Sequence, residues 1–272
     1  MNQIQIAKES IRITSERKYQ TGGQTVLLPE RDYTEVTVLT PADGEALLRA
    51  PLPQGKQSCR ISVTTESSFG AAARFRNPLV MNYANAHHAG GGFLLGANAQ
   101  EEALCRCSTL YASIKSDKAA EMYRYNNTHL SSTESDYMLL SQDVSVFRGD
   151  SLALLPEPFS VGVITAPAPN RRGAAVFASA KTIEETFLRR IRIILRAAAK
   201  YGYRDLILGA WGCGAFGNDP KIVAKAFRTA LTEEGVSTQF DNAVFAIYGS
   251  PTGRNYTAFH SVFSDLLPGD EQ

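Results

Sequence analysis

The sequence lacks any apolar run that approaches the roughly 18 residues needed to span a bilayer. Its first residues, Met1 to Ile13, mix polar and apolar side chains and contain no apolar segment of the signal-peptide type. Net charge is also nearly absent, because 28 basic and 27 acidic side chains leave a formal charge of +1. We therefore expect a cytoplasmic protein without bulk affinity for membranes or nucleic acid, in which a polyanionic ligand needs a local site.

Cysteine is scarce, with four residues in the chain: Cys59, Cys105, Cys107 and Cys213. None of them forms a C-x-x-C pair, and no paired histidine motif accompanies Cys105 and Cys107. This pattern argues against a zinc site and predicts reduced, buried thiols. We expect neither a metal nor a cofactor.

Residues 1–58 differ in pattern from the remainder of the 272-residue chain. The pair Gly22-Gly23 and several prolines punctuate them, and one β-strand is predicted, over residues 34–39. We predict that residues 1–58 form an N-terminal extension packed on a main domain of residues 59–272. A chain of this length suits one large α/β domain, or one domain with an extension.

From Cys59 onward, predicted strands and helices alternate. Strands are expected at residues 60–64, 79–83, 144–147, 160–165, 206–211 and 242–248. Helices are expected at residues 67–75, 100–113, 181–201, after the capping residue Asp219, and at 256–267. This alternation predicts an α/β fold with a largely parallel sheet flanked by helices, whose ligand binds at the carboxyl ends of the strands.

A glycine triplet carries the first chemical signal. Gly90, Gly91 and Gly92 are followed after seven residues by Gln100-Glu101-Glu102. Bare glycine amides can line an anion site at the head of a helix, which we expect to begin near Gln100. Acidic residues in a first helical turn also have a purely structural explanation, because they interact well with the helix dipole. The long glycine-rich loop favours function, although the spacing is neither that of a dinucleotide fingerprint nor that of a P-loop.

A second glycine loop, residues 211–218, lies between a predicted buried strand and the helix capped by Asp219. Its amides suit a diphosphate. Phe216 within it belongs either to the core or against a sugar or base. Asn85, at the end of the strand before the first loop, is suited to a ribose hydroxyl but is also a common turn residue.

Together these segments resemble the signature of the poly(ADP-ribose) glycohydrolases of microbial type. The likeness starts with Asn82-Tyr83-Ala84-Asn85, continues through the glycine triplet and Gln100-Glu101-Glu102, and extends through residues 146–148, 164–170 and 209–218, in order. It covers roughly residues 60 to 265. One departure is His88-Ala89 before the triplet, where the family leads us to expect a proline; this departure implies a change in loop rigidity.

The resemblance implies a macrodomain fold and a substrate that carries ADP-ribose. It assigns Glu102 as the catalytic acid and gives Glu101 the role of holding the ribose next to the scissile bond. An aromatic residue near the C-terminal end stacks on adenine, and Phe259, or alternatively Tyr256, is the residue expected here. The other residues that it places around the substrate are Asn85, Gly90, Gly91, Gly92, Gln100, Gly212, Cys213, Gly214, Ala215, Phe216 and Gly217.

General chemistry sets one condition on this assignment. Cleavage of a ribosidic bond passes through an oxocarbenium-like state, so a neutral carboxyl must protonate the leaving oxygen. A helix N-terminus lowers the pKa of a glutamate, whereas burial and a neighbouring carboxylate raise it. We expect the acid to be set up mainly when bound substrate excludes water.

Three other functions stay open at this point. The chain is alternatively a hydrolase of single ADP-ribose groups on proteins, a non-catalytic ADP-ribose-binding macrodomain, or a nucleotide-binding regulator. The paired glutamates argue against a pure binder, and the missing nucleotide fingerprints argue against the regulator. Expected partners are ADP-ribose and ADP-ribosylated protein or polymer, with no specific nucleic acid, and the protein is expected to be a monomer.

Overall fold

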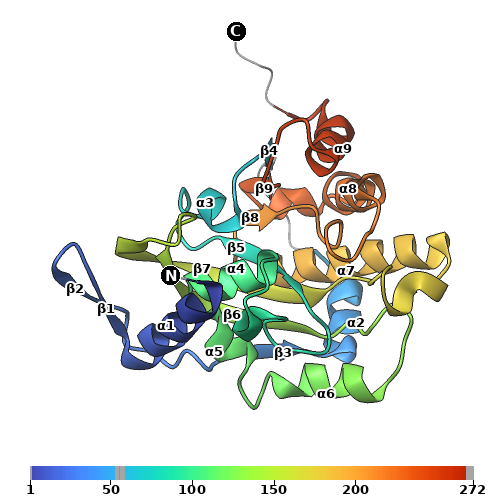
Figure 1. Cartoon of the computed structure of the whole chain (residues 1–272). Coiled ribbons are helices and arrows are strands. Elements are labelled where there is room, and N and C mark those ends of the chain that lie inside the picture. Colours follow the sequence, from blue (N-terminus) through green and yellow to red (C-terminus); the bar gives the residue numbers. More distant parts are fainter. Residues whose placement is uncertain (1, 53–54, 56–58, 268–272) are drawn as a thin grey trace, which may run out of the picture.

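A mixed seven-stranded sheet lies at the centre of the computed structural model, which describes residues 2–52, 55 and 59–267 (Figure 1). Its strands, in spatial order, are β3 (Thr37–Leu39), β6 (Met138–Arg148), β7 (Leu154–Pro167), β5 (Leu79–Ala84), β8 (Asp205–Leu208), β9 (Asn242–Ala246) and β4 (Arg60–Thr64). The five strands from β7 to β4 run parallel, and β6 pairs antiparallel with both β7 and β3. The predicted α/β class with a largely parallel sheet is confirmed.

Successive side chains of the central strands enter two different hydrophobic clusters. Leu79 and Met81 of β5 belong to one cluster, and Val80 between them belongs to the other. This alternation follows from the period of two along a strand, and it requires apolar helices on both faces of the sheet.

The helices supply that cover in two layers (Figure 1). Those of the first cluster are α2 (Pro41–Arg49), α7 (Ala180–Lys200), α8 (Pro220–Arg228) and α9 (Arg254–Phe263). Those of the second cluster are α1 (Gln3–Glu16), α3 (Ser68–Ala72), α4 (Gln100–Cys107), α5 (Leu110–Ile114) and α6 (Ala120–Thr128). Among the described residues, no helix is both long enough and apolar enough to cross a bilayer.

The predicted single helix over residues 100–113 is wrong, because the structure divides it into α4 and α5. At the division, Thr109 N–H donates to Ser145 O (3.0 Å), and Ser145 N–H donates to the Thr109 hydroxyl (3.0 Å). Ser108 has extended backbone and forms a bridge with Val146. These bonds to β6 replace the helical ones, and they keep α4 as a short element whose first turn carries the two glutamates.

Residues before Cys59 contribute to both layers and to the sheet. α1 packs against α4, α2 packs against α7, and β3 is an edge strand of the main sheet. A separate hairpin of β1 (Lys18–Thr21) and β2 (Gln24–Leu27) turns at the predicted Gly22-Gly23 pair. The predicted boundary after residue 58 lies beside residues 53–54 and 56–58, which are outside the described residues, so the division into extension and main domain stays a prediction.

Candidate active site

The first glycine loop begins where β5 ends and closes over the first turn of α4. Gly91 has a φ of +53°, and a methyl group built on it would lie 2.5 Å from Glu102 Oε1 and 3.4 Å from Glu101 Oε2. An alanine here would be strained and would also collide with the carboxyls. The loop backbone therefore lies directly against both glutamates because residue 91 has no side chain.

Glu101 is the deeper of the two carboxyls, with 3% of its surface exposed. Its Oε2 accepts the Asn85 backbone N–H (2.8 Å), and its Oε1 accepts the Asn82 side-chain amide at a longer 3.4 Å. Asn82 is fully buried in β5 and donates also to the Thr165 hydroxyl of β7 (3.1 Å). Two neighbouring strands thus fix Glu101.

Glu102 is held by the backbone of the loop that precedes its own helix. Its Oε1 accepts the Gly92 N–H (2.9 Å) and its Oε2 accepts the Ala99 N–H (3.1 Å). The bond from Ala99 is a helix-capping interaction, because Glu102 is the third residue of α4. Glu102 therefore combines the structural role expected of a first-turn glutamate with a fixed place against the glycine loop.

Burial raises the pKa of the Glu101 carboxyl from its ordinary value of 4.5 to about 8. The Glu102 carboxylate adds to the rise, whereas the backbone amides of Asn85 and Gly90 and the amide of Asn82 oppose it. Near neutral pH, Glu101 therefore keeps its proton, and a neutral carboxyl lies beside Glu102. A site that must donate a proton at neutral pH needs such a group.

Gln100 begins α4, where the helix was expected to start, and its side chain is engaged within the protein. Its side-chain amide donates to Met81 O (2.7 Å) and to the Ser68 hydroxyl (3.1 Å), and its oxygen accepts the Tyr83 N–H (2.9 Å). These bonds join the start of α4 to the exposed backbone of β5. Gln100 is therefore a positioning residue for the glutamate pair, and its amide is occupied within the protein.

Asn85 stabilises the first part of the loop that follows β5. Its Oδ1 accepts the backbone N–H groups of His87 (2.8 Å) and His88 (3.0 Å), which leaves its amide nitrogen as the group available to a ligand. His87 Nδ1 lies 2.9 Å from Asn127 Oδ1 of α6. The family leads us to expect a proline just before the glycine triplet, where this chain has His88-Ala89. Here these hydrogen bonds stabilise the loop.

The second glycine loop follows β8, the strand next to β5. The Trp211 indole donates to Ala166 O (3.1 Å), and the Asn218 amide donates to Pro169 O (2.8 Å) and Gly212 O (2.9 Å). Gly214 and Ala215 between these anchors are exposed, and Phe216 is half-buried against the core. The predicted loop thus has buried ends and an accessible middle, which suits amides that face a ligand.

Cys213, also predicted to bind substrate, is a buried thiol. Its Sγ lies 3.5 Å from Trp211 O, and burial raises its pKa to about 12. The side chain belongs to the packing beneath the loop. Only its backbone can contribute to the accessible surface.

The aromatic assignment at the C-terminal end needs correction. Phe259 is fully buried, and its ring packs against Phe245 (centroids 5.3 Å apart) and Phe227 (6.5 Å). It is a core residue and cannot stack on a base. Tyr256 is half-buried, and Tyr248, which sequence reasoning missed, is 80% exposed just after β9. Its position at the carboxyl end of a parallel strand makes Tyr248 a further candidate for the stacking role.

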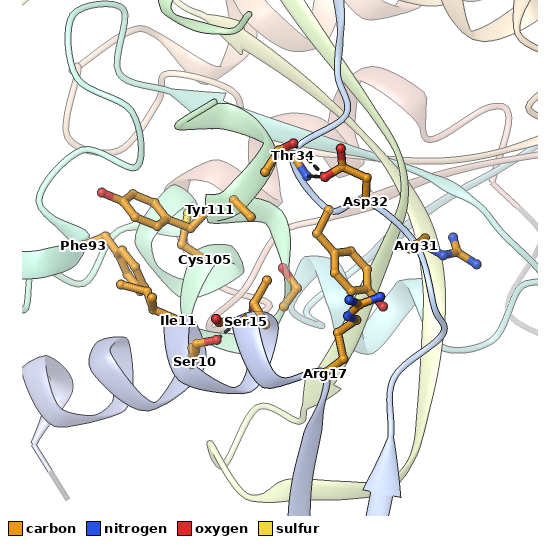
Figure 2. Close-up of a pocket in the computed structure, with 14 residues that line it drawn as sticks. Ser10, Ile11, Ser15, Arg17, Arg31, Asp32, Thr34, Phe93, Cys105 and Tyr111 are labelled. Carbon is orange, nitrogen blue, oxygen red and sulfur yellow. Dashed lines mark hydrogen bonds between the residues drawn. The ribbon is translucent and has the colours of Figure 1, made fainter. Parts of the chain in front are cut away.

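A cavity of about 520 Å³ lies between α1, residues 31–34 and α5 (Figure 2). Phe93, Cys105 and Tyr111 form one of its walls. Tyr111 and Cys105 also touch the first loop from behind, because a methyl group on Gly90 would meet the tyrosine ring at 3.0 Å and Cys105 Sγ at 3.5 Å. None of the predicted site residues lines this cavity. α1 lies on the cavity side of the wall formed by Phe93, Cys105 and Tyr111, and the other side of this wall supports the first glycine loop.

The arrangement combines two adjacent buried carboxyls, one of them neutral near pH 7, with two loops of accessible backbone amides. All of these groups lie at the carboxyl ends of β5 and β8, where open α/β sheets bind ligands. Within the described part of the chain, no group of three or more His, Cys, Asp or Glu side chains is arranged to hold a metal ion. The residues present can transfer a proton and bind an anion.

Comparison with known proteins places these features in a family. A sequence model described as "Microbial-type PARG, catalytic domain" matches residues 7–149. Poly(ADP-ribose) glycohydrolase (PARG) from Thermomonospora curvata is 34% identical, with a TM-score of 0.89, covering 96% of this chain and 99% of that one. Its complex with the inhibitor ADP-HPD has a TM-score of 0.86 at 34% identity, covering 95% and 98%.

PARG from Deinococcus radiodurans, in a complex with ADP-ribose, is 36% identical, with a TM-score of 0.80, covering 89% of this chain and 100% of that one. A comparison with curated proteins gives no match.

Proposed function

The chain belongs to the microbial-type poly(ADP-ribose) glycohydrolase family, and from this premise we propose that it hydrolyses the ribosidic bonds of poly(ADP-ribose) and releases ADP-ribose. The observation that carries the proposal is the carboxyl pair of Glu101 and Glu102, buried directly beneath Gly91. A protein that only binds ADP-ribose has no need of a neutral carboxyl at this place. The proposal is a metal-independent glycosidase reaction.

Glu102 acts as the general acid. It protonates the oxygen that leaves the anomeric carbon of the terminal ribose, and the ribosidic C–O bond breaks with oxocarbenium character. A water molecule then adds to that carbon and returns a proton to the carboxylate. The products are ADP-ribose and a polymer shortened by one unit.

Glu101 positions the ribose next to the scissile bond. Supporting this division of roles, Glu101 is held by Asn82 and the Asn85 N–H and is 3% exposed, whereas Glu102 is 7% exposed and its Oε1 lies directly against Gly91. Because the two carboxyls interact, the proton that burial keeps on Glu101 near neutral pH belongs to the pair. The pair therefore holds one proton near neutral pH, and Glu102 donates this proton to the leaving oxygen.

The exposed amides of the second glycine loop, around Gly214 and Ala215, hold the diphosphate. Gly90 to Gly92 approach it from the first loop, and Phe216 lies against the ribose. Support for this placement comes from the two loops themselves, which follow the adjacent strands β5 and β8.

The test is incubation of the protein with automodified, polymer-bearing protein and, separately, with mono-ADP-ribosylated protein. We expect release of free ADP-ribose from the polymer. Release from the mono-modified protein alone would favour a mono-ADP-ribosyl hydrolase, and release from neither, with ADP-ribose still bound, would favour a binding macrodomain.

We further propose a cytoplasmic location, since all four cysteines are free thiols, as is usual in a reducing compartment. A monomeric state stays a prediction, which size-exclusion chromatography with light scattering would check.

A further inference from the structure

The order of the strands sets the order in which their loops follow one another along the carboxyl edge of the sheet. Along this edge β9, β8, β5 and β7 are consecutive parallel neighbours. Under the proposed function, the base lies near Tyr248 after β9, the diphosphate lies on the loop after β8, and the reacting ribose lies at the loop after β5. The loop after β7 comes next in this order. A leaving group that extends from the reacting ribose in the same direction reaches this loop.

The loop after β7 begins beside the catalytic loop. Ala84 at the end of β5 pairs with Pro167 at the end of β7. The loop is also joined to the second glycine loop, because Arg171 N–H donates to Phe216 O (3.0 Å) and the Asn218 amide donates to Pro169 O. The loop after β7 is therefore fixed by strand pairing with β5 and by hydrogen bonds to the second glycine loop.

The loop after β7 carries basic side chains, of which Lys181 pairs with Glu185 of α7 (3.8 Å). Residues 167–181 contain three basic side chains, Arg171, Arg172 and Lys181, and no acidic ones. Arg171 and Arg172 are exposed, and among the described residues neither has an ion-pair partner, although 17 ion pairs engage many other arginines. The N-terminus of α7 follows directly and adds partial positive charge.

Apolar side chains accompany the charge. Val176 and Phe177 in the 3-10 turn Ala174–Phe177 are 59% and 91% exposed, whereas Ala175 between the arginines and Phe177 is fully buried and anchors the turn. The stem of Arg172 lies against Gly217, with its Cγ 3.4 Å from a methyl group built there. An exposed aromatic ring in the same loop as two guanidinium groups without ion-pair partners is a combination suited to the bases and phosphates of a single-stranded polyanion.

We propose that the loop after β7 binds the part of poly(ADP-ribose) on the leaving-group side of the scissile bond. Arg171 and Arg172 contact the diphosphate of the next unit, and Phe177 stacks on its adenine. This proposal rests on the proposed function and adds to it the residues that hold the leaving part of the polymer. A protein leaving group supplies neither a second diphosphate nor a second base.

The test compares the wild type with the triple variant Arg171→Met, Arg172→Met, Phe177→Ser. Methionine keeps an apolar stem against Gly217 while it removes the charge. We expect KM for polymer to rise by about tenfold or more, because both the stacking of a base and the contacts to its phosphates are lost. ADP-ribose affinity and the rate on mono-ADP-ribosylated protein should stay within about twofold.

The matched control is Arg76→Met with Leu27→Ser. Arg76 is exposed just before β5, at the opposite edge of the sheet, and Leu27 is 70% exposed in the N-terminal hairpin. An unchanged KM for polymer in the triple variant would overturn the proposal. If the triple variant lost ADP-ribose affinity to the same extent as polymer affinity, the three residues would belong to the site of the terminal unit. If it lost activity equally on polymer and on mono-ADP-ribosylated protein, the loop would bind the protein carrier. Both results contradict the proposal.

A second measurement needs no variant. Raising the salt concentration should raise the wild-type KM for polymer more steeply than the Kd for ADP-ribose, because additional phosphates are neutralised on the polymer. Equal salt dependence would contradict the proposal. A wild type that releases no ADP-ribose from polymer would instead refute the proposed function itself.

Discussion

At the scale of single residues, the glutamate pair shows how one short motif carries structure and chemistry together. Glu102 caps α4 through the Ala99 N–H and also lies against Gly91, while Glu101 is enclosed by two strands. The structural explanation of first-turn glutamates and the catalytic one are therefore compatible. Burial, which the sequence pattern does not quantify, decides that the helix dipole does not keep Glu101 ionised at neutral pH.

The raised pKa of Glu101 predicts a pH dependence of stability. Between its ordinary pKa of 4.5 and its folded-state pKa of about 8, the folded chain keeps a proton that the unfolded chain has lost. The free energy of unfolding should therefore fall as pH rises through this window. Glu101→Gln lacks this titrating carboxyl. Across the window its free energy of unfolding should therefore fall by up to about 5 kcal/mol less than that of the wild type, at about 1.4 kcal/mol per pKa unit.

Urea unfolding of both proteins at several pH values checks this, with the exposed Glu184→Gln as the control. If wild type and Glu101→Gln lose stability in parallel between pH 5 and 8, the raised pKa is refuted.

Gly91 offers a test of the close approach between loop and carboxyls. Gly91→Ala should weaken ADP-ribose binding at least tenfold, because its methyl group would displace Glu102 Oε1. Gly22→Ala is the matched control, since Gly22 has a similar φ of +56° but nothing within 4 Å of the added methyl group. Both substitutions introduce about 1–2 kcal/mol of left-handed strain. Calorimetry that found equal affinity in both variants would remove Gly91 from the site.

At the scale of elements, the sequence predicted best those segments whose signals are local. α7 was expected at residues 181–201 and is found at Ala180–Lys200, because one face is continuously apolar and Ser179 caps it. The division between α4 and α5 was not predictable, since it depends on hydrogen bonds from Thr109 to Ser145, 36 residues away. α1, α2 and α6 were also missed, as was the partition of residues 1–52 between both layers and the sheet.

For the site, the two glycine loops and the glutamate pair were predicted correctly in position, because motif order along parallel strands fixes one shared edge. The sequence did not reveal the side-chain partners of Gln100 or the burial of Phe259. Gln100 bonds to the backbone of β5, and Phe259 points into the core from α9. Which face of a short helix points inward depends on its packing partners, and the motif alone does not reveal them.

The exposed residue after β9 gives the prediction at this scale. Tyr248→Ala should weaken ADP-ribose affinity by about 5- to 150-fold, the range that corresponds to about 1–3 kcal/mol of base stacking, with little change in stability. Phe259→Ala should show the reverse pattern, a loss of about 3–5 kcal/mol of stability, because it empties a core position. Thermal unfolding and ligand titration of both variants check this. An unaltered affinity in Tyr248→Ala would leave Tyr256 as the remaining candidate.

At the scale of the whole molecule, the order of the strands arranges the site along one line. In the proposed binding mode, base, diphosphate and ribose lie over the successive parallel strands β9, β8 and β5, and the two carboxyls lie at the anomeric carbon. NAD places a planar ring directly on that carbon, where the polymer has an oxygen, and this ring should fit poorly against Glu101 and Glu102.

ADP-ribose should therefore stabilise the protein more than NAD, whose nicotinamide occupies the anomeric carbon. At 100 times its Kd, ADP-ribose contributes about 2.7 kcal/mol, which corresponds to roughly 5–10 °C in Tm for a domain of this size. Thermal unfolding with each ligand at equal concentration measures the difference. Equal shifts would contradict the placement of the distal ribose.

The central claim, that Glu102 is the acid of a poly(ADP-ribose) glycohydrolase, is tested most directly by the rate of ADP-ribose release from polymer in Glu102→Gln, measured together with its ADP-ribose affinity. The amide retains the size and hydrogen bonding of the carboxyl but cannot donate the proton. We predict near-normal affinity and a loss of turnover of about 10²- to 10⁴-fold or more, with a milder loss in Glu101→Gln. Near wild-type turnover in Glu102→Gln, with Glu101→Gln inactive, would exchange the two roles, and full activity in both variants would show that the pair is not the catalytic centre.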